Sequence, residues 1–367
     1  MKNVVIVYDG TLYTYKWIKT LMWARDEFKE RGYSLHYVNS LAFLPYKEYA
    51  SKQIDSVFKR NNVDILLIAY HHSLSQLSNR RGWDKIELLK KLRDKCGCIV
   101  WLDTADSTGT TQFEVLPYVD FYLKKQLLKD ISLYQKHQYG QRIYLDYYNK
   151  NYNISDDEID HPYTLLDPQF SHKIRVSWNI GIADIWRRGR ASFLHPYSIK
   201  SPSVCTTGKN RTVDVFFNGT IKYSSLTSFQ RQLACEMLKK DKIRNCPDPQ
   251  LKMSHEEYVE YMKNSKFAIS PFGWGEVCYR DFEAIVYGAT LLKPSVEHMI
   301  TYPNFYIPEE TYIPINWDLS NYDEILNEKA FRNSREIAIN AQELFIKHTT
   351  TKWGKVNFAE HFIDSIS

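Results

Sequence analysis

A short segment, SPFGWGEVCYRDFEAIVYGATLLKP at residues 270–294, joins a loop rich in glycine and proline to a stretch with helical spacing. The apolar periodicity predicts a helix over 276–287, and Gly288 stands where a left-handed C-terminal cap is expected. At about 100° per residue, one face of this helix is charged and the opposite face is apolar. The charged face carries Glu276, Arg280 and Glu283.

Such a segment could hold a phosphorylated ligand. Glycines at the end of a strand let a ligand approach the backbone closely, and the helix that follows presents unpaired N–H groups at a positive dipole end. Arg280 would add a fixed cation, and the Glu283 carboxylate could accept two hydrogen bonds from a ribose diol. Together these parts predict a site for a nucleoside diphosphate.

A plainer interpretation of the same segment stays open. Arg280 and Glu283 also have the i,i+3 spacing of a surface ion pair on an ordinary amphipathic helix, with the glycines forming a turn. Two other nucleotide-binding classes do not fit. GWGEVC lacks the third glycine of the dinucleotide fingerprint, and the chain has no G-x-x-x-x-G-K-[ST] loop.

The elements that would position this segment alternate between strand and helix. The first half of the chain predicts a parallel sheet covered by helices on both faces. Its expected strands are 3–9, 34–40, 63–72, 98–103 and 118–125, and its expected helices are 15–32, 46–62 and 84–97.

The same rhythm restarts in the second half, after a stretch over 140–212 without a sustained period. Residues 187–211 are typical of an interdomain connection. The expected strands are 212–219, 266–273 and 289–294, and the further expected helices are 225–241, 255–265, 323–348 and 357–366.

The fold class expected from this order is α/β, with two tandem Rossmann-like doubly wound domains and a cleft between them. The expected boundaries are 1–205 for the first domain and 206–344 for the second. We expect residues 345–367 to pack back on the first domain.

Composition narrows the class of partner. The 367 residues include 48 basic and 43 acidic side chains, a net charge of +5, without a polycationic run. This balance suits an anionic small ligand and does not indicate a nucleic-acid partner. No cysteine or histidine spacing is typical of a zinc site. Without a signal peptide or an apolar run of about 18 residues, a cytoplasmic protein is expected, with peripheral membrane contact left open.

The segment at 270–294 resembles the donor-binding segment of GT-B glycosyltransferases, especially the exostosin-like group. The shared pattern is a strand, a Gly/Pro-rich loop, R-x-x-E-A-I-x-x-G, and a strand ending in proline. Here the motif occupies residues 280–288 and the second strand ends at Lys293-Pro294. The likeness covers roughly 213–310. Glu276 and Glu283 are spaced E-x6-E, which departs from the E-x7-E of many retaining members.

The resemblance implies a hexosyl- or pentosyltransferase of polysaccharide biosynthesis. Such an enzyme moves a sugar from a nucleotide sugar, UDP- or GDP-linked, to a glycan or lipid-linked acceptor without a metal. The first domain would bind the acceptor and the second the donor, with Glu283 at the ribose. The residues expected at the donor are Gly219, Thr220, Ser270, Phe272, Gly273, Trp274, Gly275, Glu276, Arg280, Asp281, Glu283 and Lys293.

An inverting transferase also needs a general base. Four side chains at the expected ends of the N-terminal strands are candidates for this base or for acceptor binding: Asp9, His71, Asp103 and Asp106. Acids at such positions also cap helices and turns, so a purely structural role for Asp103 and Asp106 stays open.

Two rival functions fit the same pattern. The first is a nucleotide-sugar epimerase or hydrolase on a similar two-domain fold. The second is a non-catalytic module that binds a carbohydrate or a nucleotide. The sugar, the nucleotide base, the acceptor and the stereochemistry depend on the shape of the pocket, which residue types alone do not give.

Overall fold

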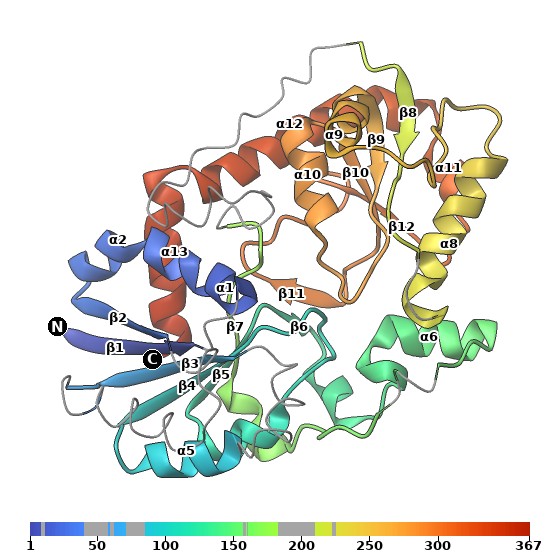
Figure 1. The fold of residues 1–367 in the computed structure, drawn as a ribbon. Helices are drawn as coiled ribbons and strands as arrows, with labels where there is room; N and C mark the ends of the chain where they lie inside the picture. Colours follow the sequence, from blue (N-terminus) through green and yellow to red (C-terminus); the bar gives the residue numbers. More distant parts are fainter. Residues whose placement is uncertain are drawn as a thin grey trace.

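The computed structural model describes residues 1–8, 12–39, 58, 62–70, 85–156, 159, 161–182, 210–221 and 225–367. Most of the predicted helix 46–62 and of the predicted connection 187–211 lies outside these ranges, as do Asp9 and His71. The described residues form two parallel sheets with helices around them (Figure 1). We call the described residues up to 182 the first unit, and those from 210 to 349 the second unit.

The sheet of the first unit has the order β2-β1-β3-β4-β5-β7 among the described residues, and all of its neighbouring strands are parallel. Alternate side chains of these strands enter two separate cores, one on each face, as expected of a doubly wound sheet. The strands are β1 (Lys2–Tyr8), β2 (Tyr33–Asn39), β3 (Ile65–Tyr70), β4 (Cys98–Asp103), β5 (Phe121–Lys124) and β7 (Ile174–Val176).

Helices α1 (Leu12–Trp23) and α2 (Arg25–Glu30) contribute to one of these cores, and α5 (Lys85–Arg93) contributes to the other. The five strands predicted in this half are confirmed. The chain between β4 and β7 also contains short 3-10 turns: η1 (Phe113–Tyr118), η2 (Ile131–Gln135), η3 (Tyr139–Gln141) and η4 (Pro168–Lys173).

The second sheet has the order β12-β10-β9-β8 and is also parallel throughout. Its strands are β8 (Val213–Phe216), β9 (Ser265–Ile269), β10 (Thr290–Pro294) and β12 (Ile313–Ile315). Its helices are α8 (Ser225–Lys240), α9 (His255–Asn264), α10 (Tyr279–Tyr287), α11 (Tyr322–Ile325) and α12 (Glu328–Thr349). The predicted α/β class, with two Rossmann-like units, is confirmed by these two sheets.

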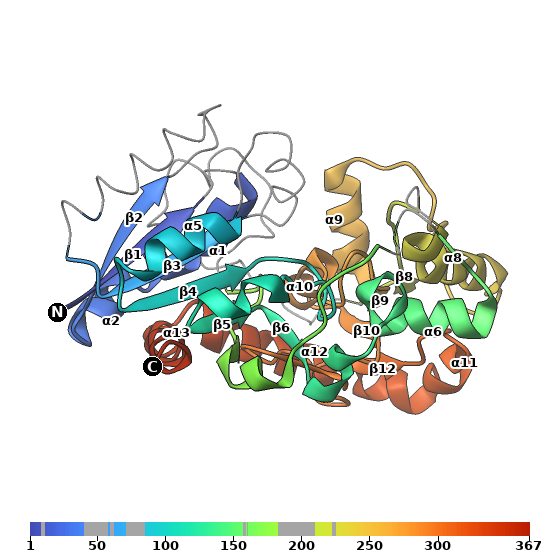
Figure 2. The ribbon, with the colours of Figure 1, turned by 90° about the horizontal axis from the view of Figure 1, so that it is seen from below.

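The region over 140–212 is more regular than the sequence predicted. It contains β7 and a helix, α6 (Ile143–Tyr152), which contacts α8 of the second unit (Figure 2). The buried face of α6 is largely aromatic, with Tyr144 and Tyr148 both 1% exposed. Because tyrosine is not counted as a strongly apolar residue, this helical stripe was missed.

A small antiparallel pair joins the two units. Strand β6 (Gln126–Leu128) follows β5 in the first unit, and β11 (Met299–Thr301) follows β10 in the second. Neither strand was predicted, because three residues are too few to show a period. Asn179 N also donates to Tyr302 O at 2.7 Å, so the two units share backbone hydrogen bonds.

The last helix, α13 (Lys352–Ser365), packs against α2 of the first unit and also contacts α12 of the second unit (Figure 1). The ring of Phe28 on α2 lies 5.4 Å from that of Phe362, and the ring of Trp178 lies 5.4 Å from that of Phe358. The domain boundaries given above remain a prediction. Among the helices of the described ranges, none is both long and apolar enough to cross a bilayer.

Candidate functional site

Helix α10 begins at Tyr279, three residues later than predicted, and ends as predicted. Gly288 has a φ of 73° and closes the helix in the left-handed conformation that glycine adopts without strain. At the other end, the carboxylate of Asp281 accepts a hydrogen bond from Cys278 N at 3.0 Å. A negative side chain of the protein itself therefore already caps this N-terminus.

Asp281 belongs to a buried polar cluster below the loop. Lys293 Nζ lies 3.0 Å from its Oδ1, and both side chains are fully buried. Tyr306 Oη donates to Oδ2 of Asp281 at 2.7 Å, and Ser270 Oγ donates to Oδ1. Three of the predicted donor residues, Ser270, Asp281 and Lys293, therefore support the loop from inside and do not line a cavity.

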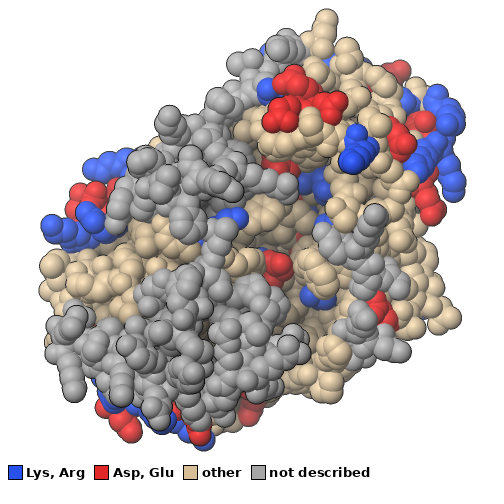
Figure 3. Space-filling view, viewed as in Figure 1, with Lys and Arg blue, Asp and Glu red and all other residues tan. Residues whose placement is uncertain are grey.

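A cavity of about 1200 Å³ lies between the two units. Its walls come from α1 and the loop after β4 on one side, and from the loops after β8 and β9 with α8, α9 and α10 on the other. Figure 3 shows this face hollowed between the units, with acidic and basic side chains in the hollow. The predicted site residues that line the cavity are Asp106, Gly219, Thr220, Gly273, Trp274, Gly275, Arg280 and Glu283.

Arg280 extends from α10 to the loop after β8. Its Nη2 donates to Asn218 O at 3.2 Å, and its guanidinium carbon lies 4.7 Å from the centre of the Phe217 ring. A Cβ atom at Gly219 would lie 2.6 Å from Nη2 of Arg280, so the glycine leaves room for the guanidinium group in this position. The arginine is therefore held against the backbone at the carboxyl end of β8.

A second arginine, Arg231 on α8, is held in the same way against the loop after β9. Its Nε donates to Phe272 O at 3.2 Å, and its Nη1 donates to Thr220 O at 2.8 Å. A Cβ atom at Gly273 would lie 2.5 Å from its Nη2. The sequence did not identify Arg231 as a site residue, because its partners come from two distant loops. Phe272 itself is buried, with its ring 4.9 Å from that of Tyr144.

Glu283 lies one turn further along α10 and also lines the cavity. Tyr258 Oη on α9 donates to its Oε2 at 2.8 Å. Burial, together with the nearby Glu283 carboxylate, raises the pKa of Tyr258, so this hydroxyl keeps its proton. Tyr258 was not predicted, because nothing in the sequence links it to a residue 25 positions away.

The stretch 249–255 completes the second unit's side of the cavity and includes the cation Lys252. It ends in the capping box of α9, in which Glu257 N donates to Ser254 Oγ at 3.2 Å and Ser254 N donates to Glu257 Oε2 at 2.7 Å. The cap fixes the start of α9, and with it the position of Tyr258.

Asp106 is the carboxylate of the first unit that faces the cavity. Tyr13 Oη and Lys125 Nζ each donate to its Oδ1 at 2.8 Å. The Asp106 side chain is 40% exposed, whereas that of Lys125 is 1% exposed. Lys125 thus holds Asp106 through a buried ammonium group, while the Asp106 carboxylate stays partly exposed in the cavity wall.

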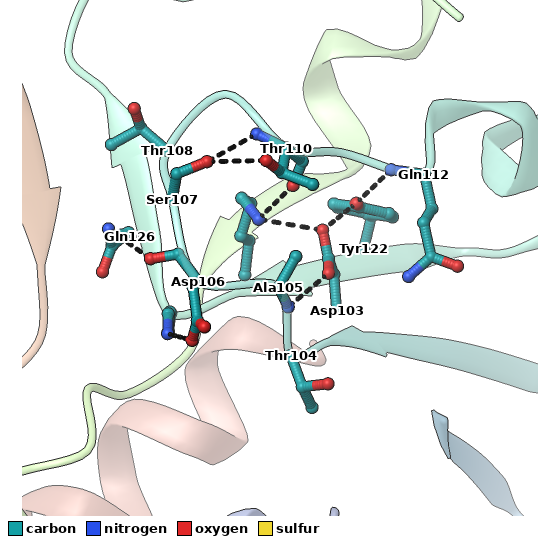
Figure 4. A network of polar contacts seen from close by, with 12 residues as sticks. Asp103, Thr104, Ala105, Asp106, Ser107, Thr108, Thr110, Gln112, Tyr122 and Gln126 are labelled. Carbon is teal, nitrogen blue, oxygen red and sulfur yellow. Dashed lines mark hydrogen bonds and ion pairs between the residues drawn. The ribbon is translucent and has the colours of Figure 1, made fainter. Parts of the chain in front are cut away.

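Asp103, the other candidate on this loop, is placed differently. Its side chain is fully buried, with Lys124 Nζ at 3.0 Å from Oδ2 and a hydrogen bond from Tyr122 Oη (Figure 4). Burial alone would raise its pKa, but the charge of Lys124 and the Tyr122 hydrogen bond outweigh burial and lower it. Asp103 does not line the cavity, so Asp106 is the candidate that the structure brings to it.

Glu276 was expected beside the diphosphate, but it is fully buried outside the cavity. It accepts hydrogen bonds from Thr108 N at 3.0 Å, Thr108 Oγ1 at 2.6 Å and Gln126 Nε2 at 2.6 Å, all from the first unit. His298 Nε2 lies 3.5 Å from its Oε1. Burial alone would raise the pKa of Glu276, but His298 and Thr108 lower it to about 2.

Within the described ranges, no three His, Cys, Asp or Glu side chains group as metal ligands do.

Comparison with protein-family models finds no match, and comparison with curated proteins finds none either. Several solved structures align over nearly the whole chain. HepE of Anabaena in complex with UDP is 9% identical, with 100% of this chain and 99% of that chain covered and a TM-score of 0.43. An alpha-glucosyltransferase (AGT) in complex with UDP is 12% identical, with 100% of both chains covered and a TM-score of 0.43.

Sucrose-phosphate synthase of Thermosynechococcus elongatus is 10% identical, with 99% of this chain and 98% of that chain covered and a TM-score of 0.45. All three TM-scores are below 0.5, a level of overlap that supports no inference about what this chain binds. The resemblance to the exostosin-like group is not confirmed by these structures. The function is therefore inferred from the cavity.

Proposed function

We propose that this protein is a glycosyltransferase that moves a sugar from a nucleotide sugar to an acceptor hydroxyl in the cavity between the units. The observation that carries the proposal is the placement of Arg231 and Arg280. Two loops that follow parallel strands each hold one arginine against a glycine, at the edge of the cavity. The carboxyl ends of such strands are where α/β folds bind their ligands.

The two arginines suit the diphosphate of the donor. Guanidinium groups bind phosphate oxygens through paired charge-assisted hydrogen bonds. Because both groups are fixed by backbone carbonyls, little reorganisation is needed as charge develops on the leaving diphosphate. On this ground we propose transfer without a metal, from a UDP- or GDP-linked hexose or pentose. Such donors are made in the cytosol, which favours a cytoplasmic location.

Glu283 suits the ribose of the same donor. One of its oxygens already accepts from Tyr258, which fixes the carboxylate in the cavity wall. A fixed carboxylate can accept hydrogen bonds from vicinal hydroxyls, as the sequence motif predicted. Glu283 and Arg280 lie on the same helix, nearly one turn apart. This spacing would let Glu283 bind the ribose while Arg280 binds the phosphate attached to it.

The part of the cavity between the first unit and the exposed aromatic rings of the second unit suits the acceptor. Trp274 and Tyr279 line the cavity and are 46% and 39% exposed, opposite a wall that includes Tyr13 and Asp106. Aromatic faces with a nearby carboxylate bind the apolar faces and the hydroxyls of sugars. We therefore propose a glycan or lipid-linked sugar as acceptor. Asp106 would bind the reacting hydroxyl and accept its proton if the transfer inverts configuration.

The test is nucleotide binding, followed by product analysis. Thermal unfolding is measured with UDP, GDP, CMP, ADP and NAD, each with and without Mg²⁺ or Mn²⁺. The proposal predicts that UDP or GDP raises the midpoint equally with and without metal. If no nucleoside diphosphate stabilises the fold, a donor site is absent. If NAD stabilises it, the cavity belongs to another class of enzyme.

Products separate the transferase from its two rivals. With the preferred nucleotide sugar and a panel of oligosaccharide acceptors, the proposal predicts a lengthened acceptor and free nucleoside diphosphate. Release of free sugar at the same rate without any acceptor would identify a hydrolase. An isomerised nucleotide sugar would identify an epimerase, and binding with no turnover on any acceptor would identify a binding module.

A further inference from the structure

Glu276 has an arrangement that the proposed donor site does not explain. It lies in the loop between β9 and α10, in the second unit, yet three hydrogen bonds to its carboxylate come from the first unit. Both oxygens are used. Oε1 accepts from the hydroxyl of Thr108, and Oε2 accepts from Thr108 N and from the side-chain amide of Gln126.

The backbone next to Glu276 also contacts the backbone of the first unit. A Cβ atom at Gly275 would lie 1.7 Å from the carbonyl oxygen of Asp106, so the two chain segments touch at this point. The amide of Gln126 that donates to Glu276 also donates to Asp106 O at 3.0 Å. Gln126 is the residue at which β6 pairs with Thr301 of β11. The carboxylate thus lies where three segments from the two units meet.

Burying a carboxylate between two surfaces is destabilising unless all of its hydrogen bonds are made. Glu276 is fully buried, and its pKa of about 2 means that it is ionised at neutral pH. Hydrogen bonds to an ionised group are stronger than those between neutral groups. Loss of the charge would leave the three donors of the first unit with a weaker, neutral acceptor, so this part of the junction depends on the ionised Glu276 side chain.

We propose that Glu276 is a positioning residue that locks the first unit onto the second and holds the cavity in its working shape before any ligand binds. Asp106 lies two residues before Thr108, and Trp274 lies two residues before Glu276. The lock therefore sets the separation between the proposed acceptor side and the proposed donor loop. The lock itself rests on contacts alone, whereas its value for catalysis rests on the proposed function.

The lock predicts a cavity that is formed in advance and does not close over the donor. Small-angle scattering of the full chain should give the same radius of gyration with and without UDP. A contraction when UDP binds would show that the units close on the nucleotide, and it would overturn the proposal.

Hydrogen exchange of the full chain without ligand tests the lock more directly. In Glu276→Gln, the amides of 104–110 and 126–128 should exchange about tenfold faster or more, since a charge-assisted acceptor is lost. The amides of β1, β3 and β9 should keep the protection of the parent protein. Glu310→Gln, a substitution of an exposed glutamate in the same unit, is the matched control and should change nothing. Parent-like exchange over 104–110 in Glu276→Gln would overturn the proposal.

Thr108→Val is the second variant, for the case in which Glu276→Gln does not fold. It removes one hydroxyl donor and keeps the shape of the side chain, so faster exchange is expected over the same amides. A folded Thr108→Val with unchanged exchange would likewise overturn the lock.

Nucleotide affinity separates the lock from the proposed function. As a positioning residue, Glu276 should leave the Kd for UDP within about threefold of the parent value, because it does not touch the cavity. A large loss of UDP affinity with unchanged exchange would make Glu276 a donor ligand and refute the lock. A parent protein that binds no nucleotide, but whose Glu276→Gln variant exchanges faster at 104–110, would refute the proposed function and keep the lock.

Discussion

The carbonyl oxygen of Asp106 lies against Gly275 so closely that a Cβ atom on this glycine would be 1.7 Å away. This contact joins a loop of the first sheet to a loop of the second at the edge of the cavity. Both partners are backbone, so neither can move aside by rotating a side chain. The spacing between the two loops therefore depends on the absence of one carbon atom.

Gly275→Ala should destabilise the fold by about 2–3 kcal/mol, because the two loops must separate to admit the methyl group. Urea unfolding, followed by fluorescence, measures the difference. Gly97→Ala is the matched control, since its Cβ atom would meet Asp64 O at an ordinary 3.9 Å. Equal stability of the two variants would mean that the contact between Asp106 and Gly275 relaxes freely.

Arg231→Ala and Arg280→Ala should each weaken UDP binding about tenfold or more, since each removes charge-assisted hydrogen bonds to phosphate. Uridine, which lacks phosphate, should lose little affinity in either variant. Isothermal titration with both ligands measures the two effects, and Arg335→Ala, at an exposed position on α12, is the control. Equal losses for UDP and uridine would count against the phosphate role.

Glu283→Ala should abolish discrimination between UDP and 2′-deoxy-UDP, because the carboxylate is the proposed acceptor for the ribose hydroxyls. The parent protein should prefer UDP by about tenfold, the size expected for one hydrogen bond to a charged group. Tyr258→Phe should reduce this preference only in part, since it removes the group that orients Glu283 and keeps the carboxylate. A parent protein that binds both nucleotides equally would remove the ribose role.

Asp106→Asn should affect catalysis, whereas Asp103→Asn should affect stability. Asp106 faces the cavity, so the Asp106→Asn variant should still bind nucleotide. It should transfer sugar about 100-fold more slowly, within the usual range for the loss of an acid–base group. Asp103 is buried with Lys124, so the Asp103→Asn substitution leaves a buried cation without its counter-charge. It should lower the stability of the fold by about 3–5 kcal/mol. Rates of transfer and urea midpoints for both variants check the assignment.

Lowering the pH should reduce the stability of the fold through His348, which lies where α12 meets α13. Burial lowers the pKa of His348 to about 4, below the value of about 6.5 expected in the unfolded chain. The unfolded state therefore binds more protons between these two values, so stability falls as the pH drops from 6.5 to 4. Urea midpoints across this range should show the loss, and His348→Gln should make the dependence shallower. An unchanged pH dependence in His348→Gln would exclude this histidine as the cause.

The sequence predicted the parts of the fold that carry a long local pattern. Runs such as 65–70 and 98–103 are apolar almost throughout, so they were identified as buried parallel strands, and Gly288 marked the end of α10. Strands β7, β11 and β12 have three residues each and show no period. Their pairing partners lie far away in the chain and cannot be read from local spacing.

The residues of the candidate site were also predicted only in part. Arg280 and Glu283 could be predicted as a pair because they share one helix, and both line the cavity. Arg231 and Tyr258 were missed because only the folded chain places them in the same cavity. Glu276 was assigned to the donor because of its place in the motif, whereas its partner Thr108 is 168 positions away. The roles expected of Asp9 and His71 remain predictions, since both residues lie outside the described ranges.

The packing of α13 on α2 has a consequence for how the protein is made. Phe28 and Trp178 are fully buried, and rings from the last 16 residues of the chain, those of Phe358 and Phe362, cover them. During synthesis the first sheet leaves the ribosome long before α13 is made, so this apolar surface stays uncovered until α13 folds onto it. A stalled or truncated chain would keep that surface exposed, which gives quality-control chaperones a feature by which to distinguish unfinished molecules from complete ones.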